Sequence, residues 1–369
     1  MKKILILSHE ATFTGAPLFL LRLLKFLNQT NSYEFLILFN KSGKLLSEFK
    51  SQAKIILVPN NRLRLIFYRL KILIFNPELI ISNTIVNSNL LSFVNLENTK
   101  LITIVHEMKG VIHLFDELKL NNAKEIISKS SHFIAVSNSV KMDLVQEFKI
   151  KEKNIDVIYN GISLKEKNVV DKTEIDQWKD NLNIPKESFI VGSCGSITWR
   201  KGPDIFINIL KEIKQNFNLE NIYFIWLGGS NEVYWLSNLK EEINSLGLNE
   251  HIKFLSEVQD TSNFYNAIDV YISTAREEPF GLTILEAGAN SKPCLAFEGS
   301  GGPQEILSNK KGILIPYGDT NRAAKEIIKL KEIPLHKEKY SNSIKDAVLN
   351  YSSKTTNSKY KEIIDSFII

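Results

Sequence analysis

The chain has 369 residues, of which 44% are hydrophobic and 24% are charged, and its net charge is +5. This composition is ordinary for a soluble globular protein, and the length favours two domains because a single core seldom grows beyond about 250–300 residues. Residues 1–160 contain 21 Lys and Arg against 13 Asp and Glu, a net charge of +8, and the remaining residues carry a net charge of −3.

The basic first part of the chain limits the kinds of partner. It has no basic cluster interleaved with stacking aromatic residues and no known nucleic-acid motif, so we expect no nucleic-acid partner. An anionic membrane surface or a phosphorylated acceptor fits the charge better.

The cellular compartment is inferred from missing signals. The start, MKKILILSHE, has an apolar run of only four residues, which is too short for a signal peptide. No stretch has the roughly 18 uncharged apolar residues of a transmembrane helix. Cys194 and Cys294 form no disulfide or metal-binding pattern, and because each follows an apolar run we expect buried, reduced thiols. We therefore expect a cytoplasmic protein, with peripheral binding to the inner face of the membrane as an alternative.

In the first part of the chain, short continuous runs of Ile, Leu and Val alternate with helical patterns such as Pro17–Leu27 and Ser139–Phe148. This alternation predicts a parallel sheet covered on both faces, in a first domain of residues 1–165. The predicted strands are Lys3–Leu7, Tyr33–Phe39, Lys54–Val58, Leu79–Ser82, Leu101–Val105, His132–Val136 and Asp156–Ile158.

A polar segment, Leu164–Lys172, separates this series from a second one of the same kind. We predict a second doubly wound domain, residues 166–345, and a C-terminal helix, 346–369, that crosses back to the first domain. Ligands of such sheets bind at the carboxyl ends of the strands, so the expected site is a cleft between the two domains. The predicted strands are Phe189–Cys194, Tyr223–Leu227, Ile252–Leu255, Val270–Ser273, Pro293–Phe297 and Gly312–Ile315.

Three features of the first domain stand out along the chain. In FTGAP, Phe13–Pro17, Gly15 would bring the backbone close to a ligand, although a simple tight turn is the alternative. The stretch Asn61–Pro77 has four basic residues and no acidic one, and is either a helix at a membrane interface or, as we prefer, a core-packed helix with a basic edge. His106 and Glu107 follow the strand Leu101–Val105 at the edge expected to face the cleft.

The second domain begins with a candidate phosphate-binding loop, FIVGSCGSITWRKGP. Gly195 follows a strand, and Arg200 and Lys201 precede Pro203, a residue well suited to the first turn of a helix. Two cations at a helix N-terminus and a strand's carboxyl end fit a phosphate group. Solvated basic residues beside a turn are the alternative.

The stretch REEPFGLTILEAGANSKPCLAF holds two carboxylates, Glu278 and Glu286, around a helix predicted from about Gly281 to Asn290. Its predicted apolar stripe consists of Leu282, Leu285 and Ala289. The first N–H groups of this helix favour an anion, and the carboxylates can accept hydrogen bonds from the vicinal hydroxyls of a sugar. A loop-end cap and a solvated helix residue are the alternative for the pair. A later glycine loop, Gly299–Pro303, is either part of the same site or a tight turn.

Several catalytic motifs are missing from the sequence. It contains no D-x-D pair, HExxH, G-x-S-x-G or Walker A motif. We therefore expect a site without a metal and without a cofactor beyond a nucleotide-diphosphate sugar as co-substrate.

With these residues in place, the chain resembles the retaining GT-B glycosyltransferases of family four, over nearly its whole length. EPFGLTILEA is the most specific of the matching motifs. The others are TGAP, IVHE, VSNSVK, VIYNGIS, GSITWRKG, DVYIST, GGPQE and ILIPYGD.

The resemblance implies roles for five residues of the second domain. Glu278 looks like the carboxylate that contacts hydroxyls of the donor sugar. Phe280, Gly281 and Leu282 look like the backbone segment that holds the sugar and diphosphate, and Glu286 resembles the acceptor of the ribose hydroxyls.

It also implies that Lys201 binds the diphosphate, that Gly15 contacts it from the first domain, and that His106 lies near the transferred sugar. The family usually has Arg after the first glycine of the phosphate loop, where this chain has Ser196 after Gly195. Our hypothesis is that Arg200 supplies the missing cation.

The implied reaction is transfer of a sugar, with retention of configuration, to a hydroxyl group of a glycan or lipid-linked acceptor, in surface polysaccharide or glycolipid biosynthesis. Positive groups would stabilise the departing diphosphate while the anomeric carbon develops oxocarbenium character. A GT-B sugar-nucleotide epimerase and a non-catalytic sugar-nucleotide binding protein are the alternatives.

Overall fold

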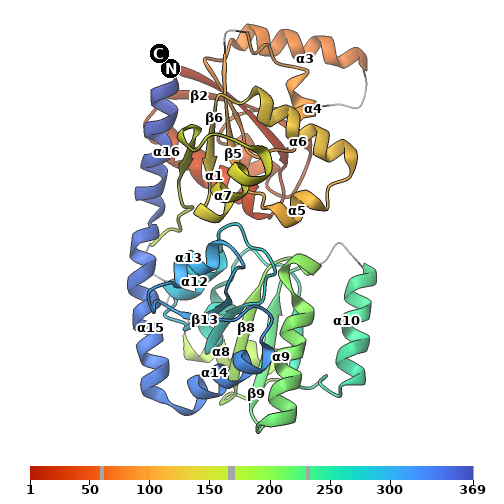
Figure 1. Ribbon diagram of the computed structural model, residues 1–369, viewed down its shortest axis with the longest axis vertical. Coiled ribbons are helices and arrows are strands. Elements are labelled where there is room, and N and C mark those ends of the chain that lie inside the picture. Colours follow the sequence, from red (N-terminus) through yellow and green to blue (C-terminus); the bar gives the residue numbers. More distant parts are fainter. Residues whose placement is uncertain (59–61, 98, 165–170, 230–232, 369) are drawn as a thin grey trace. The chain divides into compact units, whose positions relative to one another are not determined.

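The computed structural model describes residues 1–58, 62–97, 99–164, 171–229 and 233–368 (Figure 1). The chain folds as two compact units. The first consists of Met1–Gly161 and Ser353–Ile369, and the second of Ile162–Ser352. The two parallel sheets and the C-terminal helix that returns to the first unit confirm the predicted α/β architecture.

The first unit contains a sheet of seven parallel strands in the order β3-β2-β1-β4-β5-β6-β7. Consecutive residues of its inner strands are buried, so both faces of the sheet are covered, as the continuous apolar runs predicted. The strands are β1 Lys2–Glu10, β2 Tyr33–Lys41, β3 Lys54–Leu57, β4 Leu79–Ser82, β5 Lys100–Val105, β6 His132–Ala135 and β7 Ile155–Val157.

Helices connect these strands in the right order for a doubly wound sheet. They are α1 Gly15–Asn28, α2 Leu46–Lys50, α3 Arg62–Phe75, α4 Ser88–Leu91, α5 Lys109–His113, α6 Glu117–Lys129, α7 Asn138–Phe148, the short 3₁₀ turn Glu152–Asn154 and the C-terminal α16 Ser353–Phe367.

The second unit contains six parallel strands in the order β10-β9-β8-β11-β12-β13. Its core includes the packed rings of Phe206, Phe224 and Trp226, which are at most 1% exposed. The strands are β8 Phe189–Cys194, β9 Ile222–Leu227, β10 Ile252–Leu255, β11 Val270–Ser273, β12 Cys294–Phe297 and β13 Ile313–Ile315.

The helical elements of the second unit begin after its linker segment. They are α8 Lys172–Asn181, η2 Trp199–Lys201, α9 Pro203–Asn216, α10 Val233–Ser245, α11 Ser262–Ala267, α12 Leu282–Ala289, α13 Gly302–Leu307, α14 Thr320–Glu332, α15 Pro334–Val348 and η3 Leu349–Tyr351.

Each sheet has one position where the direction of strand order reverses. In the first sheet it lies between β1 and β4, and in the second between β8 and β11. At such a position the loops after two neighbouring strands leave toward opposite faces of the sheet, which opens a crevice at their carboxyl ends. The sequence could not reveal this order, because it shows the strands but not which of them pair.

The boundary between the units differs from the predicted one at the C-terminal end. Residues 346–352 belong to the second unit because α15 packs closely on α12. A Cβ added to Gly288 of α12 would lie 2.6 Å from the Ile344 side chain, so only glycine permits this approach. The ring of Tyr351 lies 5.7 Å from that of Phe280, which holds the segment after α15 against the same unit.

Helix α3 covers part of the stretch Asn61–Pro77, whose first residue lies outside the described residues. Ile72 and Phe75 are buried in the core of the first unit, as expected for a core-packed helix. The opposite side of the helix is not merely basic, however, because several large apolar side chains there are exposed. No helix among the described residues has the length and apolarity needed to cross a bilayer.

Helix α16 is attached to the first unit by an aromatic residue and a polar cluster. Tyr360 is fully buried, its ring lies 5.0 Å from that of Phe19, and its hydroxyl donates to the Ile158 carbonyl (3.2 Å). Asp365 accepts from Lys2 Nζ (2.9 Å) and from the Tyr33 hydroxyl (2.8 Å). Helix α16 thus contributes Tyr360 to the core of the first unit and Asp365 to a polar cluster at its surface.

We predict that Tyr360→Ala lowers the free energy of unfolding of the first unit by about 3–5 kcal/mol, the usual cost of removing a buried aromatic side chain. Urea unfolding followed by circular dichroism measures it. Lys359→Ala, at the exposed neighbouring position, is the control and should change stability by less than about 0.5 kcal/mol. A cost of Tyr360→Ala as small as that of the control would show that α16 is not anchored in this way.

Candidate functional site

The candidate phosphate loop leaves β8 at the reversal point of the second sheet. The Gly195 N–H donates to the Leu227 carbonyl (2.9 Å) and its carbonyl accepts from Trp226 Nε1 (2.8 Å), so both peptide groups are already used. What requires glycine here is the backbone, because Gly195 has a φ of 148° that side chains rarely adopt, whereas an added Cβ would make only an ordinary contact with the Lys201 side chain at 3.4 Å. Ser196 is exposed beside it.

Lys201 lies in the short 3₁₀ turn η2, directly before α9, which begins at Pro203 as the sequence predicted. Gly202 has a φ of 70°, a left-handed conformation that separates the turn from the helix at Pro203. This kink directs the chain so that the Lys201 Nζ reaches the loop after β11, the neighbouring strand.

There Lys201 forms an ion pair with Glu278. The two side chains are only 15% and 14% exposed. Burial lowers the pKa of Lys201, and the negative charge of Glu278 opposes that shift. Burial by itself would raise the pKa of Glu278, but the charges of Lys201 and Arg200 outweigh it and the pKa lies below its ordinary value. The Glu278 carboxylate is therefore ionised at neutral pH.

The backbone around Glu278 is fixed by the glycine loop after β12. The Glu278 N–H donates to the Ser300 carbonyl (2.7 Å), and the Gly302 N–H donates to the Glu278 carbonyl (2.9 Å). A Cβ on Gly302 would overlap the backbone of Phe280. The loop Gly299–Pro303 is thus a support for the Glu278 segment, which sequence reasoning could only leave as one of two alternatives.

Helix α12 begins at Leu282, with Gly281 as its N-cap at a φ of 105° that side chains rarely adopt. The predicted helix, Gly281–Asn290, was one residue too long at each end. The first N–H groups of a helix have no partner inside it and favour an anion in front of them. In this structure the Phe280 N–H already donates to the Glu278 carboxylate.

The buried side of α12 differs from the predicted stripe of Leu282, Leu285 and Ala289. Only Leu285 of these three is fully buried, because α12 is covered on two sides, by its own sheet and by α15. The buried residues are Ile284, Leu285, Ala287 and Gly288.

Glu286 is half-buried on α12, and the Tyr265 hydroxyl donates to its Oε2 at 3.0 Å. Burial, with the charge of Glu286, raises the pKa of Tyr265 well above its ordinary value, so this hydroxyl keeps its proton. A fixed donor on one carboxylate oxygen orients the whole group. Tyr265 thus positions Glu286.

Arg200 is held at the edge of this site. Its Nη1 donates to the Glu277 carbonyl (2.7 Å), and its charge contributes to the low pKa of Glu278. The neighbouring Arg276 makes a two-pronged ion pair with Asp204 at 2.9 and 2.6 Å. Its guanidinium group lies 4.7 Å from the centre of the Trp199 ring. Arg276 therefore ties the β11 loop to the phosphate loop.

A second cluster lies at the reversal point of the first sheet. Gly15 is exposed at the first position of α1, inside the helix and not in the loop the sequence predicted, and an added Cβ would meet nothing within 4 Å. The protein's own packing therefore does not require glycine there. Asn83 and His106 follow β4 and β5 at the same edge.

The hydrogen bonds of Asn83 determine the tautomer of His106. Asn83 Nδ2 donates to the Ala16 carbonyl (3.0 Å), which can only accept, so Asn83 Oδ1 faces His106 Nε2 at 3.2 Å. That oxygen is an acceptor, and Nε2 must therefore carry the proton. The His106 ring also lies 5.3 Å from that of Phe19. Burial lowers the pKa of His106 to about 3, so the ring is neutral.

Glu107, next to His106, points into the protein. Its carboxylate accepts from the Thr84 hydroxyl and from the His106 N–H (3.0 Å for the latter). Burial raises its pKa. Glu107 thus fixes the backbone of His106.

The two cysteines are free thiols. Cys294 is buried as predicted, but Cys194 is only half-buried, because it is the last residue of β8 where the strand leaves the core. Burial raises the pKa of the Cys194 thiol to about 12. In the part of the chain that the structure describes, no group of three or more His, Cys, Asp and Glu residues is arranged to hold a metal ion.

Within each unit, the structure thus brings together the residues that the sequence singled out. In the second unit, Lys201, Arg200 and Glu278 lie together. In the first unit, Asn83 connects the residue after Gly15 to His106, because it donates to the Ala16 carbonyl and contacts the His106 ring. Sequence reasoning missed Asn83, Tyr265 and the pair of Arg276 and Asp204. The polar residues after the apolar run Leu79–Ser82 were a usable signal for Asn83, whereas nothing in the sequence separates Tyr265 from an ordinary core tyrosine.

Two sequence families match the chain. The family described as Glycosyl transferases group 1 matches residues 174–347, and the family described as Glycosyltransferase Family 4 matches residues 15–166. The O-antigen biosynthesis glycosyltransferase WclY of Escherichia coli is 34% identical over 137 residues, which cover 37% of this chain and 35% of that protein. The matched part is thus about a third of that relative's length.

Solved structures match over the whole chain. Anabaena Alr3699/HepE in complex with UDP-glucose has a TM-score of 0.86 and 22% identity, and the match covers 99% of this chain and 100% of that one. WaaG, a glycosyltransferase involved in lipopolysaccharide biosynthesis, has a TM-score of 0.76 and 14% identity, with 98% and 99% covered. At these identities the likeness shows the fold, which is GT-B.

We predict that His106 stays neutral between pH 5 and pH 8, because burial lowers its pKa to about 3. The ¹⁵N chemical shifts of the ring should show a proton on Nε2 over this range. Asn83→Leu removes the acceptor and should remove the preference for that tautomer. A His106 that titrates near its usual pKa in the unmodified protein would contradict the assignment.

Proposed function

The chain belongs to the group 1 glycosyl transferases, and on this premise we propose that it transfers a sugar from a nucleotide-diphosphate donor to a hydroxyl group of a glycan or lipid-linked acceptor. The observation that carries the proposal is the buried pair of Lys201 and Glu278 beside the start of α12, at the reversal point of the sheet. The pair offers a cation for phosphate and a carboxylate for sugar hydroxyls in one place.

The named relatives support the class of substrate. HepE is a structural neighbour of this chain and was solved with UDP-glucose. WclY acts in O-antigen biosynthesis, and LpsD of Rhizobium meliloti in lipopolysaccharide core biosynthesis. For this chain we propose a nucleotide sugar as the only co-substrate besides the acceptor, and a role in surface polysaccharide or glycolipid biosynthesis at the cytoplasmic side of the membrane.

Each charged side chain has a part in donor binding. Lys201 and the first N–H groups of α12 would bind the diphosphate, with Phe280, Gly281 and Leu282 as the backbone against it. The Glu278 carboxylate, released from Lys201, would accept from hydroxyls of the sugar. Glu286, oriented by Tyr265, would accept from the ribose.

Bond breaking is assisted by stabilising the leaving group. As the bond between the anomeric carbon and the diphosphate oxygen breaks, negative charge grows on that oxygen, and Lys201, Arg200 and the α12 N-terminus lie where they can stabilise it. The acceptor oxygen forms the new bond on the same face and passes its proton to the departing diphosphate oxygen, so the configuration is retained. We assign the reaction to a metal-independent class because these protein groups carry the positive charge that the diphosphate needs.

In this proposal residues of the first unit also bind substrate. Gly15 leaves the start of α1 open to a phosphate oxygen. A larger side chain at this position would clash with no other protein atom but would occupy the space of the ligand. His106 is neutral with the proton on Nε2, so its Nδ1 can accept from a sugar hydroxyl.

A donor screen followed by a transfer assay tests the function. Thermal shift with UDP-, GDP- and ADP-sugars should identify a donor, and nucleoside diphosphate release should rise when a glycan or polyprenyl-linked acceptor is added. Lys201→Met should lower turnover by about 10²–10³-fold, as expected for loss of a group that stabilises developing charge. Lys240→Met, an exposed lysine on α10, is the matched control and should be unchanged.

Four other outcomes are informative. Donor rearrangement without any acceptor would replace the proposal with an epimerase, and binding with neither transfer nor hydrolysis would replace it with a binding protein. Anomeric NMR of the product reports retention or inversion, and unchanged rates in EDTA would support metal independence.

We also predict that Arg200→Ala weakens donor binding by about 10- to 150-fold, because a charge-assisted contact to phosphate is worth about 1.5–3 kcal/mol when partly shielded from water. Isothermal titration with the donor measures this effect. Lys211→Ala on α9 changes the net charge equally and is the control. Equal donor affinity and turnover in Arg200→Ala and the unmodified protein would show that another group, or none, replaces the arginine found in the family.

A further inference from the structure

Among the side chains of α3 that the structure describes, five large apolar ones are exposed. Their exposed fractions are between 52% and 79%. Ordinary surfaces carry single exposed apolar residues, but a contiguous set on one helix marks an interaction site. We call the set the α3 stripe: Ile66, Phe67, Leu70, Leu73 and Ile74.

The helix is anchored from its other side. Ile72 and Phe75 are 3% and 8% exposed and lie in the core of the first unit, with Tyr68 packed against the same core. At about 100° per residue, these positions fall on the side of the helix opposite the α3 stripe. The exposure of the stripe is therefore a property of a docked helix and not of a detached one.

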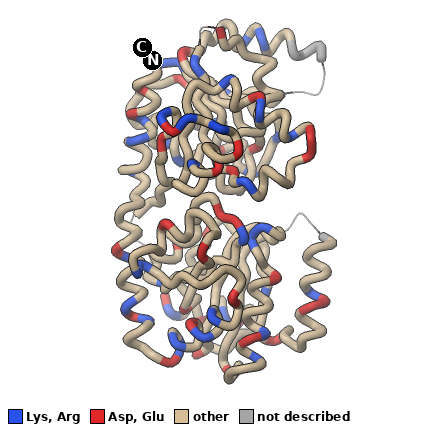
Figure 2. Tube along the Cα trace, viewed as in Figure 1, with Lys and Arg blue, Asp and Glu red and all other residues tan. Residues whose placement is uncertain are grey.

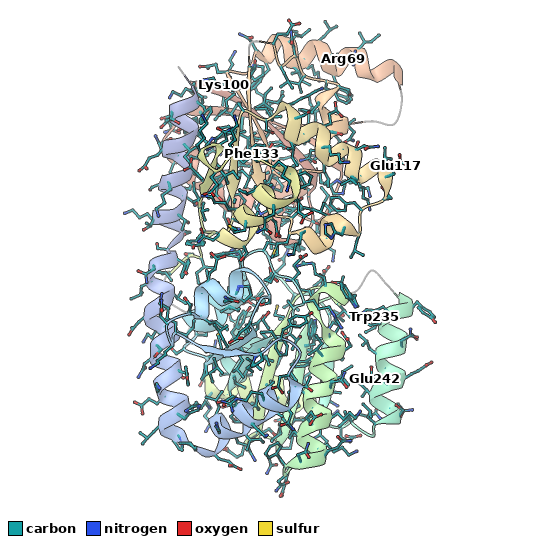
Figure 3. The ribbon with its side chains drawn as sticks, viewed as in Figure 1. Arg69, Lys100, Glu117, Phe133, Trp235 and Glu242 are labelled. Atoms are coloured by element: carbon teal, nitrogen blue, oxygen red, sulfur yellow. The ribbon has the colours of Figure 1, made fainter. Side chains whose placement is uncertain are left out.

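Positive charge borders the α3 stripe. Arg69 and Lys71 fall on its two edges by helical spacing, and Figure 2 shows Lys and Arg positions in blue on the described part of α3. In the sequence, Arg62 and Arg64 precede these two residues by seven positions each. Arg69 Nε donates to the Ser92 carbonyl at 3.0 Å (Figure 3), and Lys71 Nζ lies 4.5 Å from the centre of the Phe67 ring. Residues 49–77 contain no Asp or Glu.

The combination of apolar and positively charged side chains indicates which kind of partner binds this face of α3. A second copy of the chain docked face to face would bring the same cations together with no carboxylate on the helix to neutralise them. An anionic bilayer accepts both kinds of group, because apolar side chains enter the acyl region while lysine and arginine remain among the charged headgroups.

We propose that α3 is a membrane-binding helix that lies in the plane of an anionic lipid surface. The α3 stripe enters the bilayer, and Arg69 and Lys71 contact the headgroups. The inference deepens the proposed function in that it favours a lipid-linked acceptor over a free glycan, but binding to lipid can be measured without donor or acceptor.

Vesicle flotation with the full-length protein tests the proposal. The protein should float with vesicles of phosphatidylcholine mixed with phosphatidylglycerol, and much less with phosphatidylcholine alone. Ile66→Ser/Ile74→Ser should lower the partition coefficient at least about tenfold, because it removes two apolar side chains from the bilayer. Arg69→Glu/Lys71→Glu should lower it by a similar factor and remove most of its salt dependence.

Matched controls show whether these effects are specific to α3 or follow from any loss of exposed apolar side chains or positive charge. Leu335→Ser/Leu349→Ser removes two apolar residues that are 78% and 62% exposed elsewhere. Lys354→Glu/Lys359→Glu makes the same change in net charge on α16 of the same unit. Both controls should bind vesicles like the unmodified protein, and all variants should keep its circular dichroism spectrum and donor-induced thermal shift.

Two results would overturn the proposal. One is absence of binding to anionic vesicles, or binding that the α3 variants leave unchanged. The other is a concentration-dependent dimer in analytical ultracentrifugation that Ile66→Ser/Ile74→Ser abolishes, since the stripe would then be an interface between copies. In either case the donor and transfer assays would stand by themselves, because they require no membrane.

Discussion

The ion pair of Lys201 and Glu278 is the interaction on which the second unit's site depends. A buried ion pair seldom adds stability, because removing two charges from water costs about as much as their attraction returns. This pair is nevertheless surrounded by specific supports, namely the left-handed Gly202, the Gly302 contact and the Phe280 N–H. The Glu278 carboxylate occupies the place of an anion between the ammonium group of Lys201 and the backbone before α12. A diphosphate would find the same donors already in position.

The fold places this pair where a ligand can reach it. In both sheets the singled-out residues follow strands that flank the reversal of strand order, β1 and β4 in the first and β8 and β11 in the second. The same architecture thus supplies two different edges. One presents cations and a helix start, and the other presents the neutral His106 and an unobstructed α1.

The sequence alone predicted the strands and the charged site residues. Both show as local patterns, the strands as continuous apolar runs and the site residues as cations directly before a helix. The sequence was insufficient where long-range packing decides. The buried side of α12 depends on α15, about 50 residues later, so the predicted stripe through Leu282 and Ala289 was wrong. Asn83 and Tyr265 act through partners far along the chain, and no periodicity indicates them. Helix α3 packs one side into the core, as the preferred interpretation of Asn61–Pro77 predicted, but that interpretation did not predict the apolar side chains exposed on its other side.

A crystal structure of the protein in complex with its nucleotide sugar would test directly whether the Lys201–Glu278 pair is part of a preformed donor-binding site. The expected result is that Lys201 Nζ moves within hydrogen-bond distance of a diphosphate oxygen while the Glu278 carboxylate turns to the sugar hydroxyls. A complex in which Lys201 and Glu278 remain paired, with the diphosphate bound elsewhere, would contradict it.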